Sequence, residues 1–76
     1  MRNVGVGLDY YNNVIIVGDI VNARFRMNNP WKVMEIYMID SNTYNYHIGK
    51  GNEDIWLNYK DIEFLSHDDS SCILAN

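Results

Sequence analysis

The sequence TYNYHIGKGNEDIWLNYKDIEFL, residues 43–65, decides the fold. Apolar residues alternate with polar ones through Tyr44, Tyr46 and Ile48, stop at a break rich in Gly, Asn and Asp, and resume after it. Alternation on both sides of such a break predicts a β-hairpin with one buried face. We therefore expect the three apolar residues to form one inward row, and His47, on the polar row, to face solvent.

The segments at the two ends also read as strands. Residues 2–8 predict a short strand that Gly5 and Gly7 weaken or bend, and residues 14–17 form an apolar run too short for a helix. Residues 62–65 predict a last strand, reached through a break that suits one 3₁₀ turn. The glycine pair lacks the third glycine and the following helix of a dinucleotide loop, so a bent edge strand is preferred over a phosphate site.

The segment 20–27 alternates between apolar and polar residues. Its pattern places Phe25 and Met27 on the expected buried face and Arg24 and Arg26 on the opposite one. We therefore expect one strand over the whole segment.

Residues 31–39 form the longest strand candidate. One of its alternating rows is Trp31, Val33, Glu35, Tyr37 and Ile39. Both rows are largely apolar, which indicates a central strand that is covered on both sides for part of its length. A helix over residues 32–39 is the competing interpretation, but Pro30 and the β-rich flanks favour the strand.

Length and composition indicate one small domain. A chain of 76 residues has no room for a second core, and its two Trp and six Tyr suit compact β structure. Cys72 is the only cysteine, so an intramolecular disulfide is excluded and a reducing, cytoplasmic setting is expected. No apolar run approaches the roughly 20 residues that a membrane span needs.

The net charge of −4 is unevenly distributed. Residues 1–39 carry a formal charge of +1, whereas residues 40–76 carry −5. An acidic half repels phosphate backbones and attracts basic partners. This asymmetry is the strongest functional signal in the sequence.

The residues that could support catalysis or bind a metal do not form a convincing constellation. Residues 66–68, Ser-His-Asp, have the residue types of a hydrolase triad, but neighbours on an extended chain point in opposite directions and cannot form the relay. His67, Asp68, Asp69 and Cys72 are ligand-type residues without a CxxC or HxxxH pairing. We therefore expect no metal, no other cofactor and no enzymatic activity.

The order of these features resembles the small SH3-like β-barrels, including those with a KOW-type opening. The matching segments are Val17-Gly18-Asp19-Ile20-Val21, Thr43-Tyr44-Asn45-Tyr46, Trp56 and Asp61-Ile62-Glu63-Phe64. The chain is similar to short barrel proteins carried by phages and prophages of Gram-positive bacteria. KOW nucleic-acid readers usually carry basic loops, and the acidic residues found here count against RNA or DNA binding.

The resemblance implies an all-β fold within one domain, residues 1–76. Residues 17–65 would form a small SH3-like barrel of five to six antiparallel strands. Residues 1–16 would add an extra N-terminal strand or hairpin, and residues 66–76 would form a tail.

The first functional hypothesis is a non-enzymatic interaction module, encoded by a phage, that inhibits or redirects a host protein. Against a basic DNA-binding protein, the carboxylates would occupy phosphate sites and so mimic nucleic acid. Ordinary solubilising charge is the alternative interpretation of the acidic residues. The predicted partner-binding residues are Glu53, Asp54, Asp61, Glu63, Asp68, Asp69 and an exposed Tyr59.

The second hypothesis is a KOW-like nucleic-acid-binding module that uses Arg24, Arg26, Lys32 and exposed tyrosines. Aromatic stacking with a few cations can hold single strands even on an acidic protein. Independently of both hypotheses, the apolar run at residues 14–17 and the N-terminal strand lie outside the barrel pattern, which predicts an unpaired apolar edge that would support a homodimer.

Overall fold

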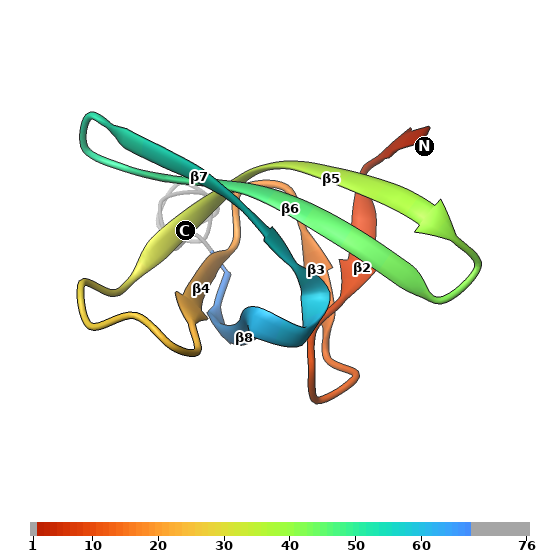
Figure 1. The fold of residues 1–76 in the computed structure, drawn as a ribbon, viewed down its shortest axis with the longest axis horizontal. Helices are drawn as coiled ribbons and strands as arrows, with labels where there is room; N and C mark the ends of the chain where they lie inside the picture. The colour runs from red at the N-terminus through yellow and green to blue at the C-terminus, as the bar shows by residue number, and fades with distance from the viewer. Residues whose placement is uncertain (1, 68–76) are drawn as a thin grey trace, which may run out of the picture.

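The protein is an all-β structure, and the computed structural model describes residues 2–67 (Figure 1). Its elements are β1 (Arg2–Val4), β2 (Val6–Leu8), β3 (Val14–Ile16), β4 (Ile20–Ala23), β5 (Trp31–Asp40), β6 (Thr43–Lys50), β7 (Glu53–Asn58), the 3₁₀ turn η1 (Tyr59–Asp61) and β8 (Ile62–Ser66). The main sheet has the antiparallel order β7-β6-β5-β4-β8, with β1 also paired to β5, and β2 and β3 form a second sheet. The prediction of a small antiparallel all-β fold is confirmed.

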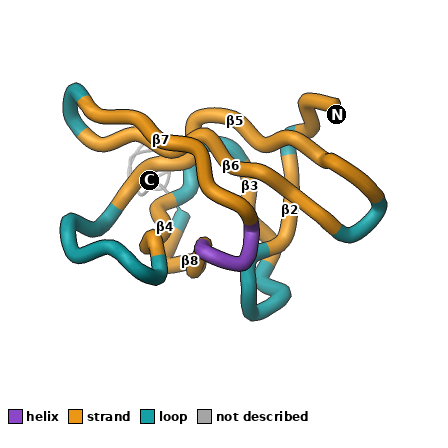
Figure 2. Tube along the Cα trace, viewed as in Figure 1, coloured by secondary structure: helices purple, strands orange, loops and turns teal. Residues whose placement is uncertain are grey.

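The hairpin of β6 and β7 protrudes from the body of the structure, and the single turn η1 follows it (Figure 2). Gly51 has a φ of +59° and occupies the first central position of the turn, where a type II′ hairpin requires a positive φ. The two strands pair without a register shift from Asn45–Asn58 to Lys50–Glu53. The predicted break rich in Gly, Asn and Asp is therefore a turn of only two residues, Gly51 and Asn52.

The alternation of β5 is interrupted. Its pairing with β6 shifts register between Val33 and Glu35, which is the mark of a β-bulge. Trp31 and Val33 are buried before the shift and Ile36 is buried after it, so Glu35 is placed on the outer face together with Tyr37. The predicted strand is confirmed, but the prediction of one uninterrupted row is wrong because the bulge exchanges the two faces.

The strand β4 is shorter than predicted because Asn29 closes its end. The Ala23 backbone N–H donates to Asn29 Oδ1 at 2.9 Å, and Asn29 Nδ2 donates to the Arg26 carbonyl at 2.8 Å. The chain leaves the sheet at Ala23, and strand alternation ends there. Phe25 and Met27 are consequently 78% and 101% exposed, so the prediction that they face the core is wrong.

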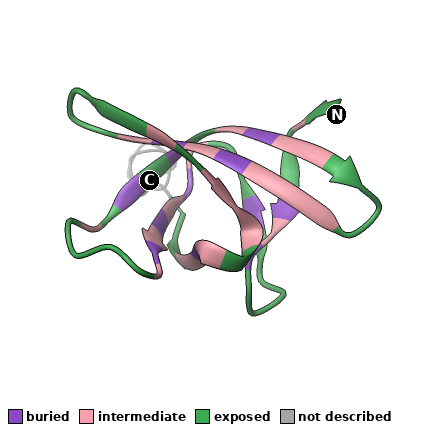
Figure 3. Ribbon diagram, viewed as in Figure 1, coloured by how far each residue is buried: buried purple, intermediate pink, exposed green. Residues whose placement is uncertain are grey.

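The core draws on both sheets, and its buried segments lie on β2 to β6 and β8 (Figure 3). Its members are Ile15, Val21, Ala23, Trp31, Val33, Ile36, Tyr46, Ile48 and Ile62. The Tyr46 hydroxyl donates to the Leu8 carbonyl at 2.8 Å, which satisfies it in the interior. A Cβ at Gly7 would lie 2.5 Å from that hydroxyl oxygen, so Gly7 is needed for close packing.

The turn between β2 and β3 is joined to β8 by a buried carboxylate. Asp9 accepts two backbone N–H groups of its own turn, both at 2.8 Å, and its Oδ2 accepts the Phe64 N–H at 2.7 Å. The Tyr10 N–H donates to the Ile62 carbonyl at 3.1 Å. The edge of β8 that faces away from β4 is therefore covered by this turn.

Candidate functional site

Three side chains lie in a row across the outer face of β5, β6 and β7. The register pairs Glu35 with His47, and His47 with Trp56, so the three are direct cross-strand neighbours. The rings of His47 and Trp56 stack with centroids 4.6 Å apart and planes 7° from parallel. Sheet register alone thus brings together residues from three strands.

His47 is held between two carboxylates. Its Nδ1 lies 2.8 Å from Glu35 Oε2 and its Nε2 lies 2.7 Å from Asp54 Oδ2. Because a neutral imidazole carries one N–H, only the imidazolium can donate both bonds. The bond to Asp54, followed by the bond to Glu35, raises the pKa of His47 above 6.5, although burial opposes the shift.

Hydrogen bonds within this network also shift the pKa values of Glu35 and Tyr37. The bond from His47, and then that from Tyr37, lowers the pKa of Glu35 below 4.5. The Tyr37 hydroxyl donates to Glu35 Oε1 at 2.9 Å, and this bond raises the pKa of Tyr37. The expectation that His47 faces solvent is correct in one respect, because its side chain lies on the outer face of the sheet. It is wrong in another, because that side chain is only 14% exposed.

Trp56 is the exposed ring at the β7 end of this row. Its ring centroid lies 5.4 Å from that of Tyr37, and the residue remains 50% exposed although His47 stacks against it. Tryptophan is enriched at protein-binding surfaces, and Trp56 is both exposed and held in place by the neighbouring rings of His47 and Tyr37. We refer to Glu35, Tyr37, His47, Asp54 and Trp56 as the outer-face cluster.

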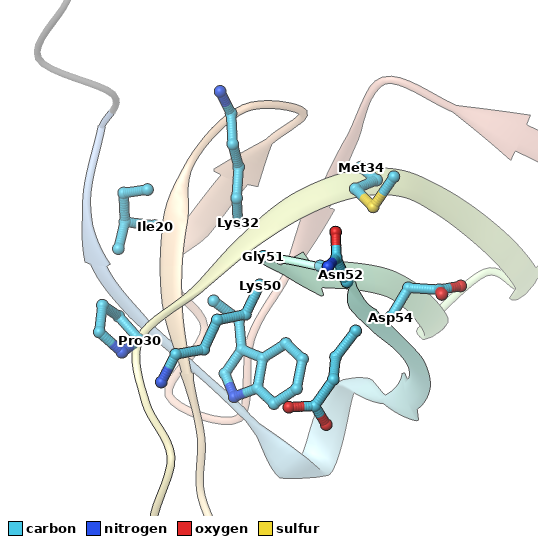
Figure 4. Close-up of a pocket in the computed structure, with 11 residues that line it drawn as sticks. Ile20, Pro30, Lys32, Met34, Lys50, Gly51, Asn52 and Asp54 are labelled. Carbon is cyan, nitrogen blue, oxygen red and sulfur yellow. The ribbon is translucent and has the colours of Figure 1, made fainter.

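A hollow of about 670 Å³ adjoins the cluster at Asp54 (Figure 4). Met34 and Asp54 lie on one side of it, and Ile20 and Pro30 lie on the other. Lys50 Nζ donates to a backbone carbonyl of the loop before β5 at 2.7 Å, which links the tip of the β6–β7 hairpin to that loop. The tryptophan that lines the hollow is Trp31, whereas the exposed Trp56 is not among its lining residues.

The acidic residues predicted to form one face lie in two places. Glu53 and Asp54 begin β7, whereas Asp61 lies in η1 and Glu63 in β8, beyond the other end of a strand that spans roughly 20 Å. Tyr59 is partly buried and packs against the core, which corrects the expectation of an exposed side chain. The predicted residues that lie outside the described part of the chain are Asp68 and Asp69.

The prediction included one member of the outer-face cluster, Asp54. His47 and Trp56 could have been paired from the sequence if the two-residue turn at Gly51 had been recognised, because the register follows from the turn length. Glu35 could not have been placed, since the bulge that turns it outward has no marker in the sequence.

A second exposed aromatic group surrounds Arg24. Its Cζ lies 3.8 Å from the centroid of the Tyr10 ring and 5.1 Å from that of Phe25, and Tyr11 packs edge-on against Tyr10. The guanidinium also donates to the Lys60 carbonyl at 2.6 Å. We refer to Tyr10, Tyr11, Arg24 and Phe25 as the arginine–tyrosine corner.

Comparisons with known proteins do not assign this site. No protein-family model, curated protein or solved structure matches the chain. Among residues 2–67, no group of three or more His, Cys, Asp or Glu side chains is arranged to hold a metal ion. In the same part of the chain, no helix has the length and apolar character needed to cross a membrane.

Proposed function

We propose that this protein is a non-enzymatic interaction module that binds a basic surface of another protein through the outer-face cluster. The observation that carries the proposal is Trp56, which is half exposed yet oriented by its stacking on His47. An ordered side chain loses little conformational freedom on binding, and tryptophan and tyrosine dominate the energetics of protein interfaces.

The charges of the cluster define the kind of partner. Glu35 and Asp54 are two carboxylates and His47 contributes at most one positive charge, so the cluster keeps a net negative charge. Glu53, next to Asp54 in β7, adds another exposed carboxylate. Arginine or lysine on a partner would be attracted by these groups and could also pack on the indole.

The more specific proposal is that the partner is a DNA-binding protein of a phage host. Its phosphate-binding cations would be occupied by the carboxylates, so the module would inhibit or redirect that protein. The resemblance to small phage barrels and the acidic half of the chain support this version.

The experiment compares two charge reversals in the tagged full-length chain, Asp54→Lys and Asp61→Lys. Both change the net charge equally, but only Asp54 belongs to the outer-face cluster. In capture from a nuclease-treated bacterial lysate, Asp54→Lys should lose a basic partner by about tenfold or more, while Asp61→Lys should keep it. Equal losses, or a loss confined to Asp61→Lys, would contradict the proposal.

Nucleic-acid binding is the second candidate function, because the arginine–tyrosine corner combines exposed rings with a cation. Of the predicted cations, Arg24 belongs to this corner and Arg26 lines a nearby hollow with Phe25, whereas Lys32 lines the large hollow beside β6 and β7. A gel shift with single-stranded DNA or RNA at low salt, lost in Tyr10→Ala, would support this function. No shift would exclude it.

A further inference from the structure

The two end strands of the main sheet differ in how their outer edges are covered. On β8, the turn between β2 and β3 occupies the edge through the Phe64 N–H and the Ile62 carbonyl. Among residues 2–67, β7 pairs with β6 alone, and no backbone hydrogen bond reaches its other edge. An uncovered edge of this kind is a template for another strand.

The open edge presents the backbone of Asp54 and Trp56. The two-residue turn makes Lys50 and Glu53 the closing hydrogen-bonded pair, and antiparallel pairing then alternates along the strand. The N–H and C=O groups of Ile55 therefore face β6, and those of Asp54 and Trp56 face outward. β7 contains no proline and no register shift, so this edge is regular throughout.

We propose that this edge receives an extended segment of the basic partner, which pairs with β7 as an added antiparallel strand. The inference rests on the proposed function, because the same tryptophan and carboxylates would contact the segment. β7 carries two carboxylates, Glu53 and Asp54, and no cation, which selects a cationic occupant.

The side chains of β7 define the sequence of that segment. Residues of the added segment that lie opposite Asp54 and Trp56 would have their side chains on the outer face, where arginine or lysine is favoured. Residues between them would lie beside Ile55 and Leu57, which pack against the core and are only partly buried. The segment is therefore expected to alternate cationic residues with branched apolar ones.

The test uses a short peptide in which arginine and valine alternate, titrated into the isotope-labelled full-length protein. Residues directly opposite Asp54 and Trp56 would be the arginines, and their N–H groups would point at β7. N-methylation of the arginines should therefore weaken binding by about tenfold or more, because it removes these hydrogen bonds and adds bulk at the edge. N-methylation of the valines leaves charge and side chains identical and should leave the affinity unchanged.

A pair of variants tests the same edge from the protein side. Asp54→Ala and Asp54→Pro both lack the carboxylate, but only the proline lacks the outward N–H. The proline variant should bind the unmodified peptide about tenfold more weakly than the alanine variant. Amide exchange in β6 verifies that the hairpin remains folded in both variants.

Three results would overturn strand addition. These are equal binding of the two N-methylated peptides, no binding of the unmodified peptide, and a dimer whose β7 amides are protected in the absence of peptide. The first would leave the proposed function intact, since a charged face can bind without strand pairing. Failure of the proposed function would appear separately, as equal capture by Asp54→Lys and Asp61→Lys.

Discussion

The outer-face cluster and the arginine–tyrosine corner use similar aromatic side chains around opposite charges. In the corner, Tyr10 already stacks on the guanidinium of Arg24, so the protein supplies its own cation. In the cluster, two carboxylates share the imidazolium of His47, and Trp56 remains half exposed. Exposed rings alone therefore do not define a partner, because the charges held beside them decide which partner is attracted.

The largest expected difference between the two regions is in partner binding. Trp56→Ala should weaken binding of the basic partner by about 2 kcal/mol or more, roughly 30-fold, as for a central interface tryptophan. Tyr10→Ala removes a comparably exposed ring from the corner and should leave the affinity within about twofold. Titration calorimetry on both variants checks this, and equal losses would remove the distinction between the regions.

The second prediction concerns the corner itself, where the aromatic contacts are internal. Arg24→Ala should lower the free energy of unfolding by about 1 kcal/mol, because stacking on Tyr10 and the bond to the Lys60 carbonyl are both lost. Arg24→Lys should retain part of this stability. Urea denaturation measures the stability of both variants. An unchanged midpoint for Arg24→Ala would show that the contacts within the corner do not stabilise the fold.

The third prediction is a pH dependence that arises in the cluster and not in the arginine–tyrosine corner. Because the folded-state pKa of His47 is raised, its stabilisation is complete below 6.5 and is lost as pH rises through the folded value. Because the pKa of Glu35 is lowered, its stabilisation is present above 4.5 and is lost as pH falls through the folded value. Stability from this network should therefore be greatest between pH 4.5 and 6.5.

The measurement is a series of denaturation curves across pH for the wild type and His47→Gln. The variant should lose the decline above pH 6.5, while Tyr10→Ala should retain the wild-type profile. Identical profiles for wild type and His47→Gln would show that the two carboxylates do not stabilise the imidazolium.

The smallest effect is expected at Phe25, the most exposed ring of the corner. Phe25→Ser should change the free energy of unfolding by no more than about 0.5 kcal/mol, because the side chain is 78% exposed. Thermal denaturation measures this change. A loss of several kcal/mol would mean that Phe25 is buried as the alternating sequence predicted.

Much of the fold could be predicted from alternation and turn residues. Local sequence pattern was sufficient to predict the inward row of Tyr44, Tyr46 and Ile48, the single 3₁₀ turn and the last strand. In a regular strand, side chains alternate between the two faces without interruption. The predictions failed where a strand contains a β-bulge or ends early. The bulge in β5 and the closure of β4 by Asn29 depend on contacts between segments, which periodicity does not encode.

The candidate site was less predictable for a related reason. Net charge indicated an acidic half, and Asp54 was among the predicted partner-binding residues, but charge along a sequence does not show which carboxylates share a face. Glu35 and His47 meet only because the bulge moves Glu35 to the outer row. Trp56 gains its role from the β6–β7 register and was predicted only as part of a strand.

The most direct test of the central claim is to map the bound partner on the isotope-labelled protein by NMR. The chain contains two tryptophans, and Trp31 is buried in the core whereas Trp56 is exposed. Binding of the captured basic partner should shift the indole signal of Trp56 and the backbone signals of His47 and Asp54, and should leave Trp31 unchanged. Shifts at Tyr10 and Arg24 with no shift at Trp56 would contradict the account and would assign partner binding to the arginine–tyrosine corner.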